Sequence, residues 1–273
     1  MKKILLFVLT ALLVVGCSSD NGEEPAGSMV EVSLNFSEFD VEMTRAVAPI
    51  SDYCNHLDVW VVSSTSTDDY HQTATDAGFG SVRLNLVVGK QYTIYAVAHK
   101  CATDATFADG IISFPDDKVT QTLYYTTTFT PANSTAIQCE MQRIVAQFRL
   151  STLDAIPDNA KKMRITLNNV FDRWNVQTGG IHQVNRVSTI NITGTNEDGT
   201  ATFTMHAICT DEATDHQVTL EALTANDQVI ASHAMTVPLR NGYRTNCVGN
   251  FFYALPLTTF VAEDWQELDS VEF

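Results

Sequence analysis

The chain has 273 residues, with 16 basic against 32 acidic side chains and a hydrophobic content of 45%. This length allows one large domain or two ordinary ones, and the formal net charge of −16 disfavours nucleic acid and anionic membrane surfaces as partners. Beyond the N-terminal segment, no apolar run is long enough to span a bilayer.

Residues 1–17, MKKILLFVLTALLVVGC, have the pattern of an export signal. Two lysines precede an apolar stretch too short for a membrane helix, and Gly16 and Cys17 end it. The pattern resembles the lipobox of bacterial lipoproteins, which implies cleavage between Gly16 and Cys17 and acyl chains, palmitate among them, on Cys17. Each buried methylene adds roughly 0.8 kcal/mol of membrane affinity. We expect residues 1–16 to be a lipoprotein signal peptide; the alternative is an ordinary cleaved secretion signal.

Residues 17–28 are polar, acidic and rich in turn formers, so we expect a flexible tether. An acidic stretch after the lipid cysteine resembles the export signal of surface lipoproteins of Bacteroidota. It implies a lipid-anchored protein exposed on the cell outer membrane; the alternative is a linker that faces the periplasm. Loss of two lysines on processing leaves 14 basic and 32 acidic residues, a net charge of −18.

The rest of the chain shows strand signals and no helical period. Apolar and polar residues alternate, as in half-buried strands, over residues 30–36, 82–86, 201–207 and 218–222. Segments rich in β-branched and aromatic residues are 57–62, 92–98, 119–126, 163–167 and 248–255. Turn-forming clusters separate these segments. The pattern predicts an all-β protein made of β-sandwiches.

A change of parity within residues 137–150 marks a domain boundary. The apolar side chains fall on odd positions up to Met141 and on even positions from Ile144. Because side chains alternate between sheet faces, the slip requires a bulge or a passage to another sheet. We therefore expect one domain over residues 29–142 and a second over residues 143–273.

Sequence motifs for catalysis or metal binding are missing, so we expect no enzyme activity, no cofactor and no metal site. The seven histidines are scattered, and a lone strand histidine such as His99 or His206 is more often structural than a ligand. The acidic cluster at 196–199 lacks the ligand spacing of an EF-hand and predicts a hairpin turn. The aspartate pairs at 68–69 and 116–117 are interpreted as solvated loop charges.

Six cysteines are present, and lipidation of Cys17 would leave an odd number in the folded part. We expect Cys139, Cys209 and Cys247, in strand-like segments, to act as small buried hydrophobes. A Cys54–Cys101 bridge is possible, but the spacing does not decide the pairing.

Several motifs together resemble the fimbrillin-type proteins of Bacteroidota. They are VEVSLNF at 30–36, MTRA at 43–46, ISDYCNHLDVWVV at 50–62, YTIYAVAHK at 92–100, ISFPDDKVTQTLYY at 112–125, MQRIVAQFRL at 141–150 and VPLRNGYRTNCVGNFF at 237–252. The resemblance is closest to the lipid-retaining anchor subunits of type V fimbriae. It implies two tandem transthyretin-like Greek-key β-sandwich domains, and other fimbrial subunits as partners through β-strand addition. Host or bacterial surface ligands are further possible partners.

The resemblance also implies a processing site and strands for donation. In polymerising members an arginine-specific protease removes the first strand, and here that cut would fall between Arg45 and Ala46. It would release the segment that carries Val30, Val32, Leu34 and Phe36 and open an apolar groove for a strand of a neighbouring subunit. The alternative for Arg45 is a basic residue in a solvated loop.

The C-terminal stretch 260–273 is a second candidate interface. Its apolar side chains, which could form an edge or donated strand, are Trp265, Leu268, Val271 and Phe273. Packing on its own domain is the simpler interpretation. Asp269-Ser270-Val271 also resembles a short O-glycosylation signal at Ser270.

The sequence thus predicts a non-enzymatic, lipid-anchored fimbrial subunit, with membrane anchor or assembly regulator as the leading role. One alternative is a shaft or tip subunit, the latter an adhesin, matured after Arg45. Another is a glycan-binding surface lipoprotein that stacks sugars on Trp60, Trp174 or Trp265. Core packing is the competing interpretation for those tryptophans.

Overall fold

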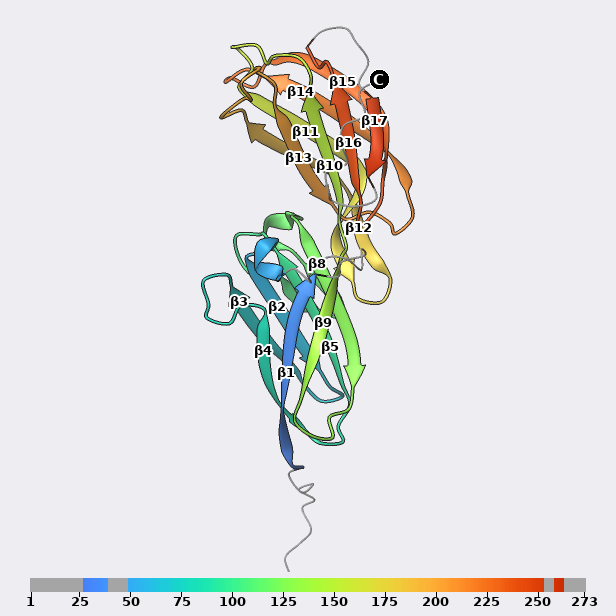
Figure 1. The fold of residues 1–273 in the computed structure, drawn as a ribbon. Coiled ribbons are helices and arrows are strands. Elements are labelled where there is room, and N and C mark those ends of the chain that lie inside the picture. Colours follow the sequence, from blue (N-terminus) through green and yellow to red (C-terminus); the bar gives the residue numbers. More distant parts are fainter. Residues whose placement is uncertain (1–26, 39–48, 253–257, 263–273) are drawn as a thin grey trace, which may run out of the picture.

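The computed structural model of the chain describes residues 27–38, 49–252 and 258–262. Almost all regular structure in these residues is β-strand, arranged as two sandwiches placed end to end (Figure 1). The described helices are two short 3₁₀ turns, η1 (Ile50–Asp52) and η2 (Pro115–Asp117). The predicted fold class, all-β with two tandem sandwiches, is confirmed.

The first sandwich has two layers, β3-β2-β5-β8 and β9-β1-β4, which join where β8 meets β9 at Leu123↔Arg143 and Tyr124↔Gln142. Alternation creates its core: in β4 every second residue is buried, and Val82, Leu84 and Leu86 pack into the cluster between the layers. Its strands are β1 (Met29–Glu38), β2 (His56–Val62), β3 (Thr67–Thr73), β4 (Ser81–Val87), β5 (Tyr92–His99), β8 (Thr122–Phe129) and β9 (Thr135–Arg143).

The second sandwich repeats this topology. One layer has the order β13-β10-β16-β17 and the other has β15-β14-β11 with β12 on the free side of β11. As β1 does between β4 and β9, β10 lies antiparallel to β13 and parallel to β16. Its strands are β10 (Ala146–Thr152), β11 (Lys162–Asn175), β12 (Gly179–Asn191), β13 (Thr202–Ala207), β14 (Thr214–Leu223), β15 (Val229–Leu239), β16 (Arg244–Gly249) and β17 (Thr258–Ala262).

An insertion between β5 and β8, residues 100–121, connects the sandwiches; we call it the flap. Its hairpin, β6 (Thr106–Ala108) and β7 (Ile111–Ser113), pairs with the distal half of β11. β11 has 14 residues, so it extends beyond β14, which pairs only with its first half, and its register with β12 shifts between Leu167 and Val170. The sequence did not reveal this pairing, in which strands from before and after residue 143 share a sheet.

Aromatic side chains fill the space between flap and sheet. Trp60 of β2 stacks on Phe107 of the flap with ring centroids 5.3 Å apart, and Tyr124 lies 5.6 Å from Trp174 of β11. These rings belong to one buried cluster that includes residues of both sandwiches. The expected domain boundary near residue 143 stays a prediction, but the hydrophobic packing continues across it.

The change from odd to even apolar positions marks a passage from one sheet to another, one of the two causes considered: β9 and β10 lie in different sheets on either side of Ile144. Two sequence predictions need correction. The strand predicted at 248–255 is wrong in its position, because β16 covers Arg244–Gly249 and ends at Gly249, whose partner Thr152 ends β10. The aspartates Asp68 and Asp69 lie in edge strand β3 instead of a loop, where charged side chains discourage further pairing of the sheet edge.

A row of polar side chains, of which Gln147 is buried and the other two are partly buried, crosses the β13-β10-β16 layer. Gln147 stands in register with His206 on one side and Arg244 on the other. The Gln147 amide donates to His206 Nε2 at 3.0 Å, while its carbonyl oxygen accepts from Arg244 Nε. His206 must keep Nε2 unprotonated to accept this bond, and burial lowers the pKa of His206 to about 4, with nearby Arg186 adding to the effect.

This row predicts a loss of stability in acid. A histidine whose pKa is lower in the folded chain than its unfolded value of about 6.5 stabilises the fold fully above that value, and this contribution disappears as the pH falls towards 4. His206→Gln keeps an acceptor but cannot titrate. Urea unfolding at neutral pH and near pH 4 should therefore show a loss about 1–2 kcal/mol smaller in His206→Gln than in the wild type. Equal losses would contradict the assignment to His206.

Candidate subunit interface

Strand β1 carries the apolar segment that the sequence marked for donation. Val32 and Leu34 are fully buried and Phe36 nearly so, whereas Val30, near the start of the strand, is partly exposed. Phe36 meets Tyr125 of the opposite layer edge to face, with centroids 6.1 Å apart. The alternate side chains of β1 thus form part of the first core.

The backbone of β1 is paired on both sides. Residues 29–35 lie antiparallel to β4 from Val87 back to Ser81, and residues 32–38 lie parallel to β9 from Thr135 to Met141. Removing β1 would separate β4 from β9 and leave two facing backbone edges without partners. An extended peptide with alternating apolar residues is the natural occupant of such a slot.

The burial of the β1 side chains contributes a large share of the stability of the first sandwich. Full burial of a Val, Leu or Phe side chain is worth roughly 1.5–3 kcal/mol, so the three buried side chains of β1 approach the net stability of a whole domain. A first sandwich that lost β1 would need a replacement strand to stay folded.

The predicted processing site, Arg45 and Ala46, lies outside the described residues, as do Gly16 and Cys17. The residues that flank the segment 39–48 lie close together, because Ser37 and Pro49 form an isolated antiparallel bridge beside the end of β1.

At the other end of the chain, β17 pairs antiparallel with β16 and forms one edge of the four-stranded layer of the second sandwich. The candidate donor residues Trp265, Leu268, Val271 and Phe273 follow it and lie outside the described residues, as does Ser270. They stay predictions.

The tryptophans expected on a flat sugar-binding face are placed differently. Trp60 is 4% exposed and Trp174 is 8% exposed, and both pack in the cluster beneath the flap. Core packing, the competing interpretation, is correct for these two, and Trp265 lies outside the described residues.

All five cysteines of the folded part are buried and none of them forms a disulfide bond, so the possible Cys54–Cys101 bridge is not formed. Burial raises the pKa of Cys139 to about 11 and the pKa values of Cys209 and Cys247 to about 12, which keeps these thiols unreactive. Cys209 follows β13 instead of lying within a strand, a small correction.

Three of the seven histidines are not scattered in space. His56, His71 and His99 converge with the buried carboxylate of Asp58 and with Asp104 of the flap. The sequence could not reveal this group, because its members come from β2, β3, β5 and the flap and share no local spacing. Strand pairing alone, His56 opposite His99 and Asp58 opposite His71, would have brought most of them together.

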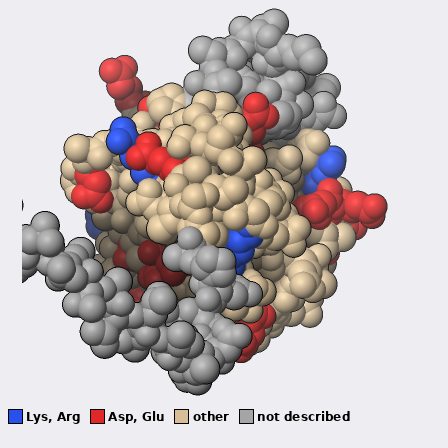
Figure 2. All heavy atoms as spheres, turned by 90° about the horizontal axis from the view of Figure 1, so that it is seen from below, with Lys and Arg blue, Asp and Glu red and all other residues tan. Residues whose placement is uncertain are grey.

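On the face of the molecule seen in Figure 2, charge does not single out a surface for an anionic partner. Figure 2 views the molecule from the end where β1 begins, and its described surface shows acidic and basic groups dispersed among uncharged atoms. Among the described residues there is also no helix with the length and apolar character of a membrane span.

A protein-family model described as a family of unknown function, DUF6562, matches residues 114–263. No curated protein matches the sequence. Similar solved structures include a putative adhesin from Bacteroides ovatus, at 14% identity and TM-score 0.56 over 87% of this chain and 95% of that one. Another is a putative polysaccharide binding protein from Bacteroides thetaiotaomicron, at 10% identity and TM-score 0.55 over 86% and 96%.

The fimbrial anchor protein Mfa2 from Porphyromonas gingivalis is also similar, at 10% identity and TM-score 0.48 over 81% of this chain and 90% of that one. The resemblance to fimbrillin-type proteins that the sequence motifs indicated is confirmed at the level of the fold by the Bacteroides structures.

The packing of β1 predicts a sharp contrast between its two faces. Leu34→Ala should lower the free energy of unfolding by about 2–5 kcal/mol, because it empties a fully enclosed site. Glu31→Ala, on the exposed face of the same strand, should change it by less than about 0.5 kcal/mol. Urea denaturation followed by tryptophan fluorescence gives both values. A Leu34→Ala effect as small as that of Glu31→Ala would show that β1 contributes little to the first core.

Proposed function

This chain belongs to DUF6562, a family of unknown function, and shares its fold with a putative adhesin and a putative polysaccharide binding protein of Bacteroides, so we propose that it is a non-enzymatic fimbrial or adhesin-type subunit. The carrying observation is β1: an apolar strand near the N-terminus, paired on both edges, whose covalent link to the rest of the sandwich runs through residues 39–48.

The proposed mechanism of assembly is strand donation. A cut between Arg45 and Ala46 would leave β1 held by non-covalent contacts alone, because residues 39–48 are its link to η1 and β2. Once β1 left, the slot between β4 and β9 would accept an apolar strand from another subunit, with main-chain pairing for affinity and alternate side chains for specificity. The partners are therefore other fimbrial subunits.

The proposed role of this subunit is the membrane anchor or assembly regulator. Lipidation at Cys17 would tie β1 to the outer membrane through residues 18–28. An uncut subunit keeps its own first strand, cannot accept one, and so ends the fibre at its base. The residues after β17, at the edge of the second sandwich, are the proposed segment for contact with the next subunit.

Cleavage after Arg45 distinguishes this role from that of a shaft or tip subunit. We expect the mature protein from its native outer membrane to begin with lipid-modified Cys17 and to keep residues 18–45, as intact mass and N-terminal sequencing would show. Arg45→Ala should leave this product unchanged. A chain that begins at Ala46 would contradict the anchor role and make this a polymerising subunit.

Attachment to the membrane gives a separate prediction. Cys17→Ser removes the acylated thiol, so the protein should move from the membrane pellet to the soluble fraction on cell fractionation. Cys54→Ser changes a buried thiol of the fold and should leave the protein in the pellet. Membrane retention of Cys17→Ser would contradict lipid anchoring.

A further inference from the structure

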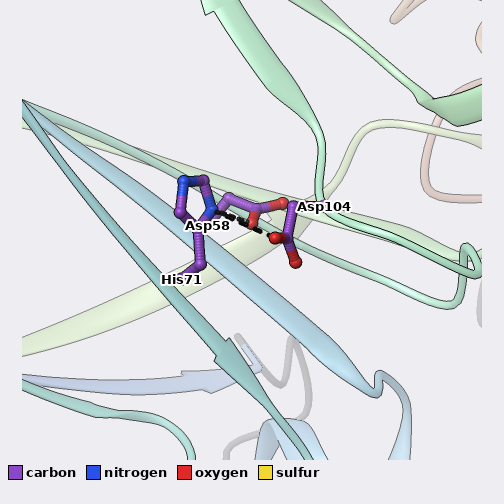
Figure 3. Close-up of side chains that lie close together, drawn as sticks. All are labelled: Asp58, His71 and Asp104. Carbon is purple, nitrogen blue, oxygen red and sulfur yellow. Dashed lines mark hydrogen bonds and ion pairs between the residues drawn. The ribbon is translucent and has the colours of Figure 1, made fainter.

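A group of histidine and aspartate side chains lies at the edge of the flap, on the outer face of β2 and β3. Figure 3 shows Asp58 of β2, His71 of β3 and Asp104 of the flap turned towards one another. One donor atom from each lies within 4.8 Å of the others. Asp58 is fully buried, whereas the side chains of His71 and Asp104 are 33% and 46% exposed, so solvent reaches the group from one side.

The buried carboxylate of Asp58 is held with one oxygen free for this group. Its Oδ2 accepts the backbone N–H of Ala105 at 2.9 Å and Nε2–H of His99 at 2.8 Å. The tautomer of His99 follows from its other nitrogen, because Nδ1 accepts the backbone N–H of Cys101 at 3.1 Å. Oδ1 of Asp58 is left pointing at His71 Nδ1, 2.6 Å away.

His71 is oriented from its far side in the same way. Its Nε2 lies 3.0 Å from Oδ2 of Asp69 on the same strand. A carboxylate therefore lies at each ring nitrogen. Burial lowers the pKa of His71, but the hydrogen bonds to Asp58 and Asp69 raise it further than burial lowers it. A cation that replaced the Nδ1 proton would meet a ring already fixed by Asp69, the carboxylate–histidine–metal arrangement of many metal sites.

We propose that Asp58 Oδ1, His71 Nδ1 and a carboxylate oxygen of Asp104 bind a divalent transition-metal ion, with Zn²⁺ as the best fit. Zinc takes nitrogen and oxygen ligands at about 2.0–2.2 Å in a tetrahedron, which places the donor atoms about 3.3–3.5 Å apart. His71 Nδ1 lies 2.6 Å from Asp58 Oδ1 and 4.0 Å from Asp104 Oδ2, each within about 1 Å of that spacing, and all three donor atoms lie within 4.8 Å of one another.

The fourth position is open to water or to His56, whose Nδ1 lies 3.1 Å from Oδ1 of Asp104. Two carboxylates with one or two imidazoles suit zinc, whereas Ca²⁺ and Mg²⁺ prefer sites made of oxygen alone. Binding displaces the Nδ1 proton of His71 to solvent, and the ligand charges balance that of the ion.

Such an ion would connect three parts of the chain. Asp58 and His71 belong to the first sandwich, whereas Asp104 precedes the β6–β7 hairpin that pairs with β11 of the second. Bound metal would fasten the start of the flap to β2 and β3 and thereby stiffen the junction. This site is independent of the proposed fimbrial role.

The test is a zinc titration by calorimetry on the full chain, purified in detergent and stripped with a chelator. We expect saturable uptake of one ion per chain. Asp104→Asn and His71→Gln should weaken binding at least tenfold, and Asp69→Asn about 10- to 100-fold. Asp104 is exposed, so its variant stays folded even where His71→Gln does not.

The matched control is His182→Gln, because His182 Nδ1 makes a similar 2.7 Å contact with Asp172 in the second sandwich but belongs to no such three-residue group among the described residues. It should bind as the wild type does. Substitution with Co²⁺ should give a spectrum without thiolate charge transfer, which excludes the free cysteines. Absence of saturable binding, or equal affinity in Asp104→Asn, would overturn the proposal and leave a hydrogen-bonded cluster only.

Discussion

Each sandwich depends on a parallel pairing between its first strand and one near its end. Val32 of β1 pairs with Thr135 of β9, and Gln147 of β10 pairs with Arg244 of β16. The strands between them are joined by short hairpins or crossovers, but neither core is closed until the first strand is in place. Such long-range contacts are entropically costly to form, so these strands are expected to insert late in folding.

The two sandwiches share a topology, but their first strands are connected to the rest of the chain in different ways. β10 follows β9 directly, so the first strand of the second sandwich is tied into the chain at both ends. β1 is preceded by the polar residues 18–28 and is followed by residues 39–48 before η1. Of the two equivalent strands, β1 is the one that a single cut could free, which is why the proposed function depends on it.

Local patterns in the sequence were enough for most strands and for the fold class. The alternation at 82–86 and 218–222 has the cause assumed for it, since one face of each strand is buried in a core. The flap pairing and the histidine–aspartate group could not be predicted, because they join residues far apart in sequence, such as Ile112 with Trp174 and Asp58 with Asp104. The strand expected at 248–255 failed for a related reason: β16 ends where its partner β10 ends, which hydrophobicity does not encode. Of the candidate interface, the apolar face of β1 was predictable; its two paired edges were not.

The direction of β1 also bears on how the molecule carries load. β1 runs parallel to β9 and antiparallel to β4, and the chain enters it at Met29, at the end of the molecule away from the second sandwich (Figure 1). A pull through the preceding residues acts along the strand axis, so the hydrogen bonds on both edges share the force instead of breaking one after another. A subunit tethered in this way would resist shear from flowing liquid through backbone geometry, without a covalent cross-link between its strands.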